Sequence, residues 1–166
     1  LKNAVLLFYQ AGHIQRAQKI YNQLRELYPR EEFKPPLADF ARNCLLEDFS
    51  RFSIHEATQA IQMLLQESYF RYAVRDDDEA FGREKLAKEA YDYYNAKYSD
   101  ETLRVNLPEF PLMKYFGLLD FLNDPEYPQD LRRSLLGRIR LERPELAEQL
   151  RQQEEKVLRQ QAEQSR

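Results

Sequence analysis

The spacing of the apolar residues is the feature that most constrains this chain, because they recur every three or four positions almost throughout the sequence. An α-helix has 3.6 residues per turn, so this spacing gathers apolar side chains on one face of a helix. The strict alternation of apolar and polar residues that is typical of half-buried strands is scarce. The sequence therefore predicts an all-α protein.

Helix-breaking and helix-capping residues divide this pattern into eight predicted helices. Pro29 ends one apolar pattern, because proline cannot donate the next backbone hydrogen bond. Ser53 and Glu56 have the spacing of a capping box, which marks a helix start. The acidic run 76–79 suits the first turn of another helix, where the macrodipole favours negative charge. The first three predicted helices cover residues 1–11, 13 or 14 to 28, and 37 to about 49. The fourth begins at Ser53 and is ended by the acidic run 76–79, which opens a fifth that reaches about residue 98. The sixth and seventh cover residues 112–122 and 128 to about 140, and an eighth begins at 144; residues 99–111 are expected to form the longest loop.

Composition excludes several classes of protein. The chain has 166 residues with a single cysteine, Cys44, which rules out an intrachain disulfide framework and a cysteine-rich zinc site. Its formal net charge of −3 argues against general nucleic-acid binding. No apolar run approaches the roughly 18 residues that a membrane span needs. We expect a soluble segment of a longer protein, with the cytoplasm favoured and an upstream anchor or export signal left open.

Motifs for metal binding and catalysis do not match. His13, His55 and Cys44 lack the spacing of zinc ligands. The acidic run that starts at Asp76 fails as a calcium loop, because its twelfth position is Ala87 where that loop needs a glutamate. No nucleophile motif accompanies the two histidines. We therefore expect no metal, no cofactor and no enzymatic activity.

The first two predicted helices carry a pattern of small and aromatic residues. Ala17 is small enough to let two helices approach closely, and Tyr21 lies one turn later. Gly12 permits a tight reversal of the chain. The positions that make up the pattern are Phe8, Gly12, Ala17, Tyr21 and Pro29. Over residues 1–29 this pattern resembles the tetratricopeptide repeat, a helix–turn–helix unit. It weakens further along the chain, where Glu84 occupies the position of the second aromatic residue.

The resemblance implies a fold and a function. The fold is a short right-handed α-solenoid of antiparallel helix hairpins over residues 1–143, closed by a charged capping helix and tail over 144–166; the alternative is an irregular helical bundle. The implied function is that of a scaffold or interaction module that binds a peptide or a partner helix in a groove. On the matched hairpin, the groove-facing positions are Lys2, Asn3, Leu6, Tyr9 and Gln10. Lys2 and Asn3 would hydrogen-bond the peptide, whereas Leu6 and Tyr9 would supply apolar contact.

The C-terminal third offers two further candidates for binding. Arg133 and Arg140 are seven residues apart on one side of a predicted helix, where they would dock an acidic peptide or a phosphate. The alternative is a solvated face whose arginines pair with neighbouring acids. The last helix is expected to dock through Leu146 and Leu150, with a solvated remainder through which a homodimer could form.

Two other functions remain open at this point. The domain could be a structural or oligomerisation element of a larger protein, or a helical bundle with an enzymatic or small-molecule pocket between its fourth and sixth helices. The 11 tyrosines are expected to lie mostly in the core. Tyr93 and Tyr94 are adjacent, so they cannot both face the same direction, and at least one of them is expected near the surface.

Overall fold

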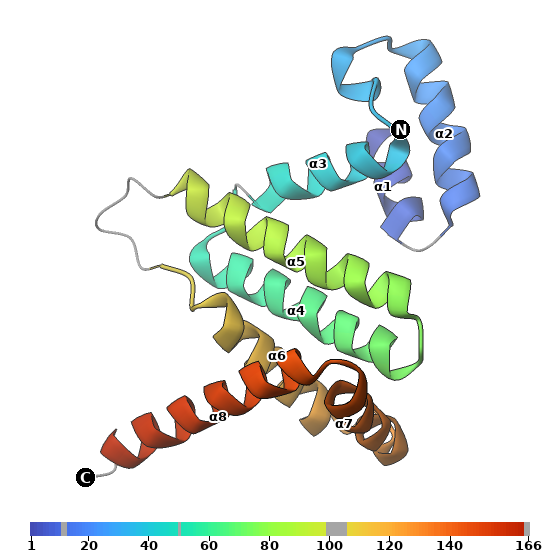
Figure 1. Ribbon diagram of the computed structural model, residues 1–166. Coiled ribbons are helices and arrows are strands. Elements are labelled where there is room, and N and C mark those ends of the chain that lie inside the picture. Colours follow the sequence, from blue (N-terminus) through green and yellow to red (C-terminus); the bar gives the residue numbers. More distant parts are fainter. Residues whose placement is uncertain (11–12, 50, 99–105, 165–166) are drawn as a thin grey trace. The chain divides into compact units, whose positions relative to one another are not determined.

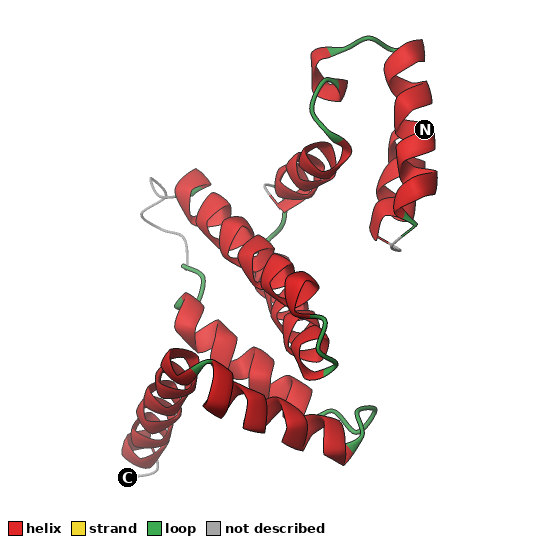
Figure 2. Cartoon of the chain, turned by 45° about the vertical axis from the view of Figure 1, so that its right-hand side comes forward, coloured by secondary structure: helices red, strands yellow, loops and turns green. Residues whose placement is uncertain are grey.

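The computed structural model describes residues 1–10, 13–49, 51–98 and 106–164. Over these residues the chain forms eight α-helices and one short 3-10 helix, η1, with no β-strand (Figures 1 and 2). The predicted all-α class is confirmed. The elements are α1 (Lys2–Gln10), α2 (Ile14–Leu27), η1 (Glu31–Phe33), α3 (Leu37–Phe49), α4 (Ile54–Ala73), α5 (Asp77–Lys97), α6 (Phe110–Asn123), α7 (Gln129–Glu142) and α8 (Pro144–Gln164).

The chain divides into two units, Leu1–Arg51 and Phe52–Arg166. The boundary that the sequence predicts after residue 143 does not coincide with a limit of these units. Helix α8 belongs with the second unit, because Leu146 and Leu150 are buried in the same core as residues of α4, α6 and α7. Each unit is described below by itself.

The core of unit 1 forms where the pair α1–α2 meets η1 and α3. Tyr21 is fully buried at its centre. The Tyr21 hydroxyl shares its hydrogen bond between the carbonyl oxygens of Phe33 (3.0 Å) and Pro35 (2.8 Å), and burial raises the pKa of this side chain. The Tyr21 and Phe40 rings lie 4.8 Å apart. The buried residues of this core are Val5, Ala17, Tyr21, Leu24, Phe33, Leu37, Phe40 and Cys44.

Unit 2 is organised around α4, which contacts α5, α6 and α7, while α8 packs against α6 and α7. One face of α4 is buried, and it carries apolar and tyrosine side chains at spacings of three and four residues. Its members are Ala57, Ile61, Leu65, Tyr69 and Tyr72. Tyr94 is 2% exposed and Tyr93 is 40% exposed, so the prediction that this pair splits between core and surface is confirmed.

Both ends of α4 are closed by hydrogen bonds. At the start, the Ser53 N–H donates to a Glu56 carboxylate oxygen (2.8 Å) and the Glu56 N–H donates to the Ser53 hydroxyl (3.3 Å), which confirms the capping box. The hydrogen bond from the Ser53 backbone lowers the pKa of Glu56. At the end, Arg75 adopts a φ of 66°, and the amides of Arg75 and Asp76 donate to the carbonyls of Tyr72 and Arg71. This is a Schellman motif with an arginine at the position that glycine usually occupies.

Several local expectations need correction or fall outside the described residues. Helix α6 begins at Phe110, with Pro111 in its first turn, so the expected loop over 99–111 ends earlier than predicted. The side chain of Asp76 pairs with Arg71 (3.3 Å) and does not cap α5. The predicted turn at Gly12, residues 99–105 and the side chain of Gln10 lie outside the part of the chain that is described.

Helix α8 docks over more of its length than the sequence predicts. Beyond Leu146 and Leu150, Gln153 is also buried, and Val157 packs against the core of unit 2. Docking through Leu146 and Leu150 was expected, whereas Gln153 and Val157 belong to the remainder of the helix through which a homodimer could form. In this structure these two residues contact the core of their own chain, and dimerisation through α8 stays a prediction.

Candidate functional site

The predicted groove residues of α1 occupy two different environments. The Lys2 ammonium lies 3.3 Å from a Glu32 carboxylate oxygen and 5.7 Å from the centre of the Phe40 ring. Leu6 and Tyr9 are half-buried and pack against the core of unit 1. Of the five predicted residues, Lys2 is therefore paired within the chain, and Leu6 and Tyr9 contribute to packing.

The exposed residues of α1 are different ones. Asn3 is exposed, and its place in a groove stays a prediction; the large apolar side chain that reaches the solvent is Leu7, which is 66% exposed. Sequence reasoning missed Leu7. The available signal is its spacing, because residues four apart lie on the same face of a helix and Leu7 follows Asn3 by four positions.

The hairpin α1–α2 has two unlike faces, and one of them is covered. The hydroxyl of Tyr21 on α2 donates to the backbone carbonyls of Phe33, the last residue of η1, and of Pro35. The Tyr21 ring packs on Phe40 of α3. Lys2 of α1 points to the same side, over the Phe40 ring. Both views of the chain place η1 and α3 on one side of the hairpin (Figures 1 and 2).

The other face of the hairpin is not covered by another described element of unit 1. Arg16, Ile20 and Leu27 are spaced by four and seven residues, so they share the side of α2 that is turned away from Tyr21. The Arg16 guanidinium lies 6.0 Å from the centre of the Phe8 ring, which places this side of α2 next to Phe8 of α1. We call this surface the open face; it comprises Leu7, Phe8, Arg16, Lys19, Ile20 and Leu27.

The open face combines apolar side chains with unpaired positive charge. Phe8 and Ile20 are half-buried, and Leu27 is 64% exposed. No carboxylate oxygen of the described residues lies within 4.0 Å of Arg16 or Lys19. Residues 1–30 contain five basic residues and one acid, but two of the basic residues, Lys2 and Arg30, lie 3.3 and 3.6 Å from Glu32. The positive charge of the open face is therefore that of Arg16 and Lys19.

The arginines of α7 and its C-terminal end have separate roles. Arg133 is exposed and lies 3.8 Å from Asp130, and Arg140 is exposed with no carboxylate within 4.0 Å among the described residues. These are the two residues of the predicted anion patch. Arg132 instead donates to the carbonyl oxygens of Tyr127 and Leu122 (2.9 and 3.0 Å), so it closes the connection between α6 and α7.

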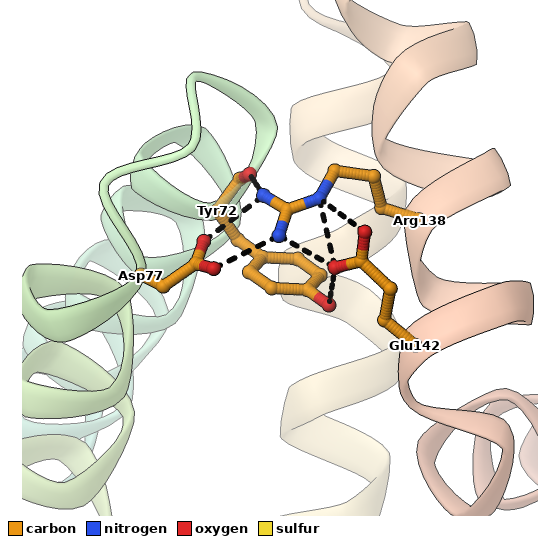
Figure 3. A network of polar contacts seen from close by, with 4 residues as sticks. All are labelled: Tyr72, Asp77, Arg138 and Glu142. Atoms are coloured by element: carbon orange, nitrogen blue, oxygen red, sulfur yellow. Dashed lines mark hydrogen bonds and ion pairs between the residues drawn. The ribbon is translucent and has the colours of Figure 1, made fainter.

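Arg138 is the centre of a buried polar network in unit 2 (Figure 3). Its guanidinium donates to both carboxylate oxygens of Asp77 (3.0 Å each), to Glu142 and to the backbone carbonyl of Tyr72, and it stacks 4.0 Å from the centre of the Tyr72 ring. The Tyr72 hydroxyl donates to Glu142 (2.8 Å). The side chain of Arg138 is only 8% exposed. The hydrogen bonds of Arg138 and Tyr72 lower the pKa of Glu142.

This network serves the fold and does not offer a binding site. The backbone carbonyl of Tyr72, which accepts a hydrogen bond from Arg138, belongs to the last turn of α4. Backbone oxygens in a last turn lack partners within the helix. Asp77 lies in the first turn of α5. Arg138 therefore joins the α4–α5 turn to α7, and its donors are used within the chain.

A shallow depression of about 420 Å³ lies beside α8; its lining residues are Lys114, Glu142, Arg143, Pro144, Glu145, Leu146 and Gln149. Behind it, the Glu84 carboxylate binds both the Lys114 ammonium (2.6 Å) and the Arg143 guanidinium (2.9 Å). Burial opposes the charge of Glu84, but the hydrogen bond from Arg143 and the charge of Lys114 outweigh it and lower its pKa. The two cations of the depression are therefore already paired.

Two further properties hold for the described residues. Among them, no group of three or more His, Cys, Asp and Glu side chains is arranged to hold a metal ion. In the same part of the chain, no helix has both the length and the apolar character that a membrane crossing requires.

Comparisons of the chain with models of protein families, with curated proteins and with solved structures gave no significant match. The resemblance of residues 1–29 to the tetratricopeptide repeat is neither supported nor contradicted by this result and stays a prediction. The assignment of function therefore depends on the geometry of the two units.

Proposed function

We propose that this chain is a non-enzymatic protein-interaction module, which binds a peptide or a partner helix through the hairpin α1–α2. The open face is the observation that carries this proposal. Exposing an aliphatic side chain to water costs a free energy of about 25 cal/mol for each Å² of apolar area. A partner that covers the side chain regains this free energy. Leu7 and Leu27 are two such side chains on one hairpin.

Within this proposal, α1 and α2 form a tetratricopeptide-like hairpin, the unit from which a solenoid is built. The burial of Ala17 and Tyr21 in the core that α1 and α2 share with α3 supports this part of the proposal. Asn3 and Leu7 on the exposed side of α1 extend the binding surface toward the predicted groove. The solenoid arrangement of the whole chain is part of the proposal.

The test compares two variants of the full chain that differ only in which surface they alter. In Leu7→Ser/Leu27→Ser the hairpin loses its exposed apolar side chains, and in Leu141→Ser/Leu158→Ser two exposed leucines of unit 2 are replaced in the same way. The wild type and both variants are immobilised and incubated with the same cell extract. The proteins that each chain retains are then quantified by mass spectrometry.

We expect at least one protein that the wild type and the unit 2 variant retain equally and that the hairpin variant loses. Circular dichroism and thermal melting establish that the variants remain folded. A set of retained proteins that is identical for all three chains, or that depends only on Leu141 and Leu158, contradicts the proposal.

A further inference from the structure

We infer that the partner of the open face is an amphipathic helix whose apolar stripe is flanked by aspartate and glutamate residues. This inference rests on the proposed function and specifies the chemistry of the partner. It follows from three properties of the hairpin: the apolar side chains of the open face, its length and its charge.

The open face presents apolar side chains against which a third helix would pack. Phe8 and Ile20 are half-buried between the two helices, while Leu7 and Leu27 stand at its edges. Helices pack when the side-chain ridges of one fit the grooves of another, at axial distances of about 8–10 Å. On the opposite face of the hairpin, the Phe40 ring of α3 packs on Tyr21. A partner helix on the open face would place the hairpin between two helices.

The length of the face sets the length of the partner. Helix α2 has 14 residues, which corresponds to about 21 Å at 1.5 Å per residue. Arg16 and Leu27 lie near its two ends. A partner helix of about four turns, with apolar residues at positions i, i+3, i+4 and i+7, would cover the whole face.

Charge selects acidic flanks for this helix. Arg16 and Lys19 border Ile20, are exposed, and have no carboxylate within 4.0 Å among the described residues. Acidic residues beside the partner's apolar stripe would pair with these two cations. Complementary charge of this kind fixes orientation and speeds association.

The same observations favour a helix over the other polyanionic partners. Nucleic-acid binding depends on basic and polar groups that contact phosphates, whereas the floor of the open face is made by Phe8 and Ile20. Segments that bind a membrane surface project their apolar side chains into the lipid. On the open face Leu7 and Leu27 project into the solvent, but Phe8 and Ile20 are half-buried and would contact the side chains of a partner helix.

The test uses two designed peptides of about 18 residues that share one leucine stripe. In one peptide the stripe is flanked by glutamate, and in the other by lysine. Binding of each labelled peptide to the full chain is measured by fluorescence anisotropy. We expect the acidic peptide to bind at least tenfold more tightly than the basic one and to lose affinity as salt is added, because exposed charges are screened.

A charge reversal tests the assignment to Arg16 and Lys19. The variant Arg16→Glu/Lys19→Glu should bind the basic peptide more tightly than the acidic one. The control is Lys85→Glu/Lys156→Glu, which makes the same change in net charge at two exposed lysines of unit 2 and should keep the preference of the wild type.

Each alternative outcome overturns the inference. Equal affinity for the two peptides, or a preference that the control variant also reverses, removes the role of the two cations. Tighter binding to phosphatidylserine vesicles or to duplex DNA than to the acidic peptide assigns the face to another class of partner. Dimerisation of the chain that Arg16→Glu/Lys19→Glu abolishes assigns the face to a second copy. In all these cases the proposed function stands if the retained protein still depends on Leu7 and Leu27.

Discussion

Three basic residues of unit 2 and two of unit 1 lie in opposite environments. In unit 2, Arg138, Lys114 and Arg143 are largely buried, and each is bound by carboxylates of the same unit. In unit 1, Arg16 and Lys19 lie on the surface beside apolar side chains without an acidic partner among the described residues. A buried cation with its partners in place contributes to the fold. An unpaired cation that borders exposed apolar residues leaves its charge available to another molecule.

The units also differ in how completely their helices are covered. In unit 2, α8 closes the core by packing on α6 and α7. Unit 1 has only three α-helices and η1 among the described part of its first 51 residues, so its hairpin is covered on one side. Small units bury a smaller fraction of their surface than large ones. The open face is therefore a consequence of the small size of unit 1, and a partner can use it.

The largest effect on stability is expected for Glu84→Gln in unit 2. This change leaves Lys114 and Arg143, with side chains 12% and 22% exposed, without their shared anion. Removing one partner from a buried ion pair exposes the cost of burying the other, and we expect the free energy of unfolding to fall by about 3 kcal/mol at neutral pH. Urea denaturation followed by circular dichroism measures it. If the free energy of unfolding fell by less than about 0.5 kcal/mol, Glu84 would contribute no more to stability than an exposed ion pair does.

The same residue gives unit 2 a defined dependence on pH. The pKa of Glu84 is lower in the folded chain than its ordinary value of 4.5. The carboxylate therefore stabilises the fold fully above about pH 4.5, and this contribution is lost as the pH falls through the folded pKa. In denaturation curves between pH 6 and pH 3, the wild type should lose more stability than Glu84→Gln. Parallel pH profiles would contradict the assignment.

A smaller effect is expected for Arg138→Met, which keeps the apolar stem of the side chain and removes the guanidinium. Asp77 and Glu142 are 45% and 43% exposed, so water replaces part of what they lose. The carbonyl of Tyr72 loses its charged donor, and we expect a loss of about 2 kcal/mol. Arg140→Met on the exposed side of α7 is the matched control and should change stability by less than about 0.5 kcal/mol. Equal effects of the two changes would show that the network contributes little.

The sequence predicted features that depend on neighbouring residues, and it did not predict contacts between residues far apart in the chain. The bounds of α3 coincide with the predicted range, and the capping box of α4 is present, because both follow from neighbouring residues. The burial of Arg138 could not be foreseen. Its partner Asp77 is 61 residues away, and the sequence shows only one arginine among five in a basic segment.

The candidate site has the same division between local and distant causes. The family pattern over the first helix predicts that Asn3 faces a groove; Asn3 is exposed, and the groove itself stays a prediction. That Lys2 would be paired and Leu7 left exposed depends on which side of the hairpin Glu32 and Phe40 occupy. The order of helices along the chain does not specify that side.

Unit 1 offers a prediction that separates the two units. In Tyr21→Phe, the buried carbonyl oxygens of Phe33 and Pro35 lose their donor, and we expect a loss of about 1 kcal/mol. Native-state hydrogen exchange should show faster exchange for amides of α1, α2 and α3, with α4 to α8 unchanged. Val5→Ala, which removes apolar contact from the same core, is a positive control for this pattern. Equal acceleration in both units would show that they unfold together.

The smallest effect distinguishes close packing from loose packing inside unit 2. Gly137 lies in α7, and an added Cβ at this position would meet no atom of another described element within 4 Å. Gly137→Ala should therefore raise stability by about 0.5–1 kcal/mol through helix propensity alone. Gly117 lies in α6, where an added Cβ would come within 3.1 Å of the Leu65 Cβ on α4.

The same substitution at Gly117 therefore gains in helix propensity and loses in packing, and we expect Gly117→Ala to be less stable than Gly137→Ala by about 1 kcal/mol. Gly117→Val extends the series, because its two added methyl groups cannot fit against Leu65 without displacing α4 from α6. Thermal melts of the three variants measure the differences. If Gly117→Ala stabilised the chain as much as Gly137→Ala, α4 and α6 would have room to separate. Unit 2 would then be less closely packed than its buried ion pairs indicate, and it would differ less from unit 1.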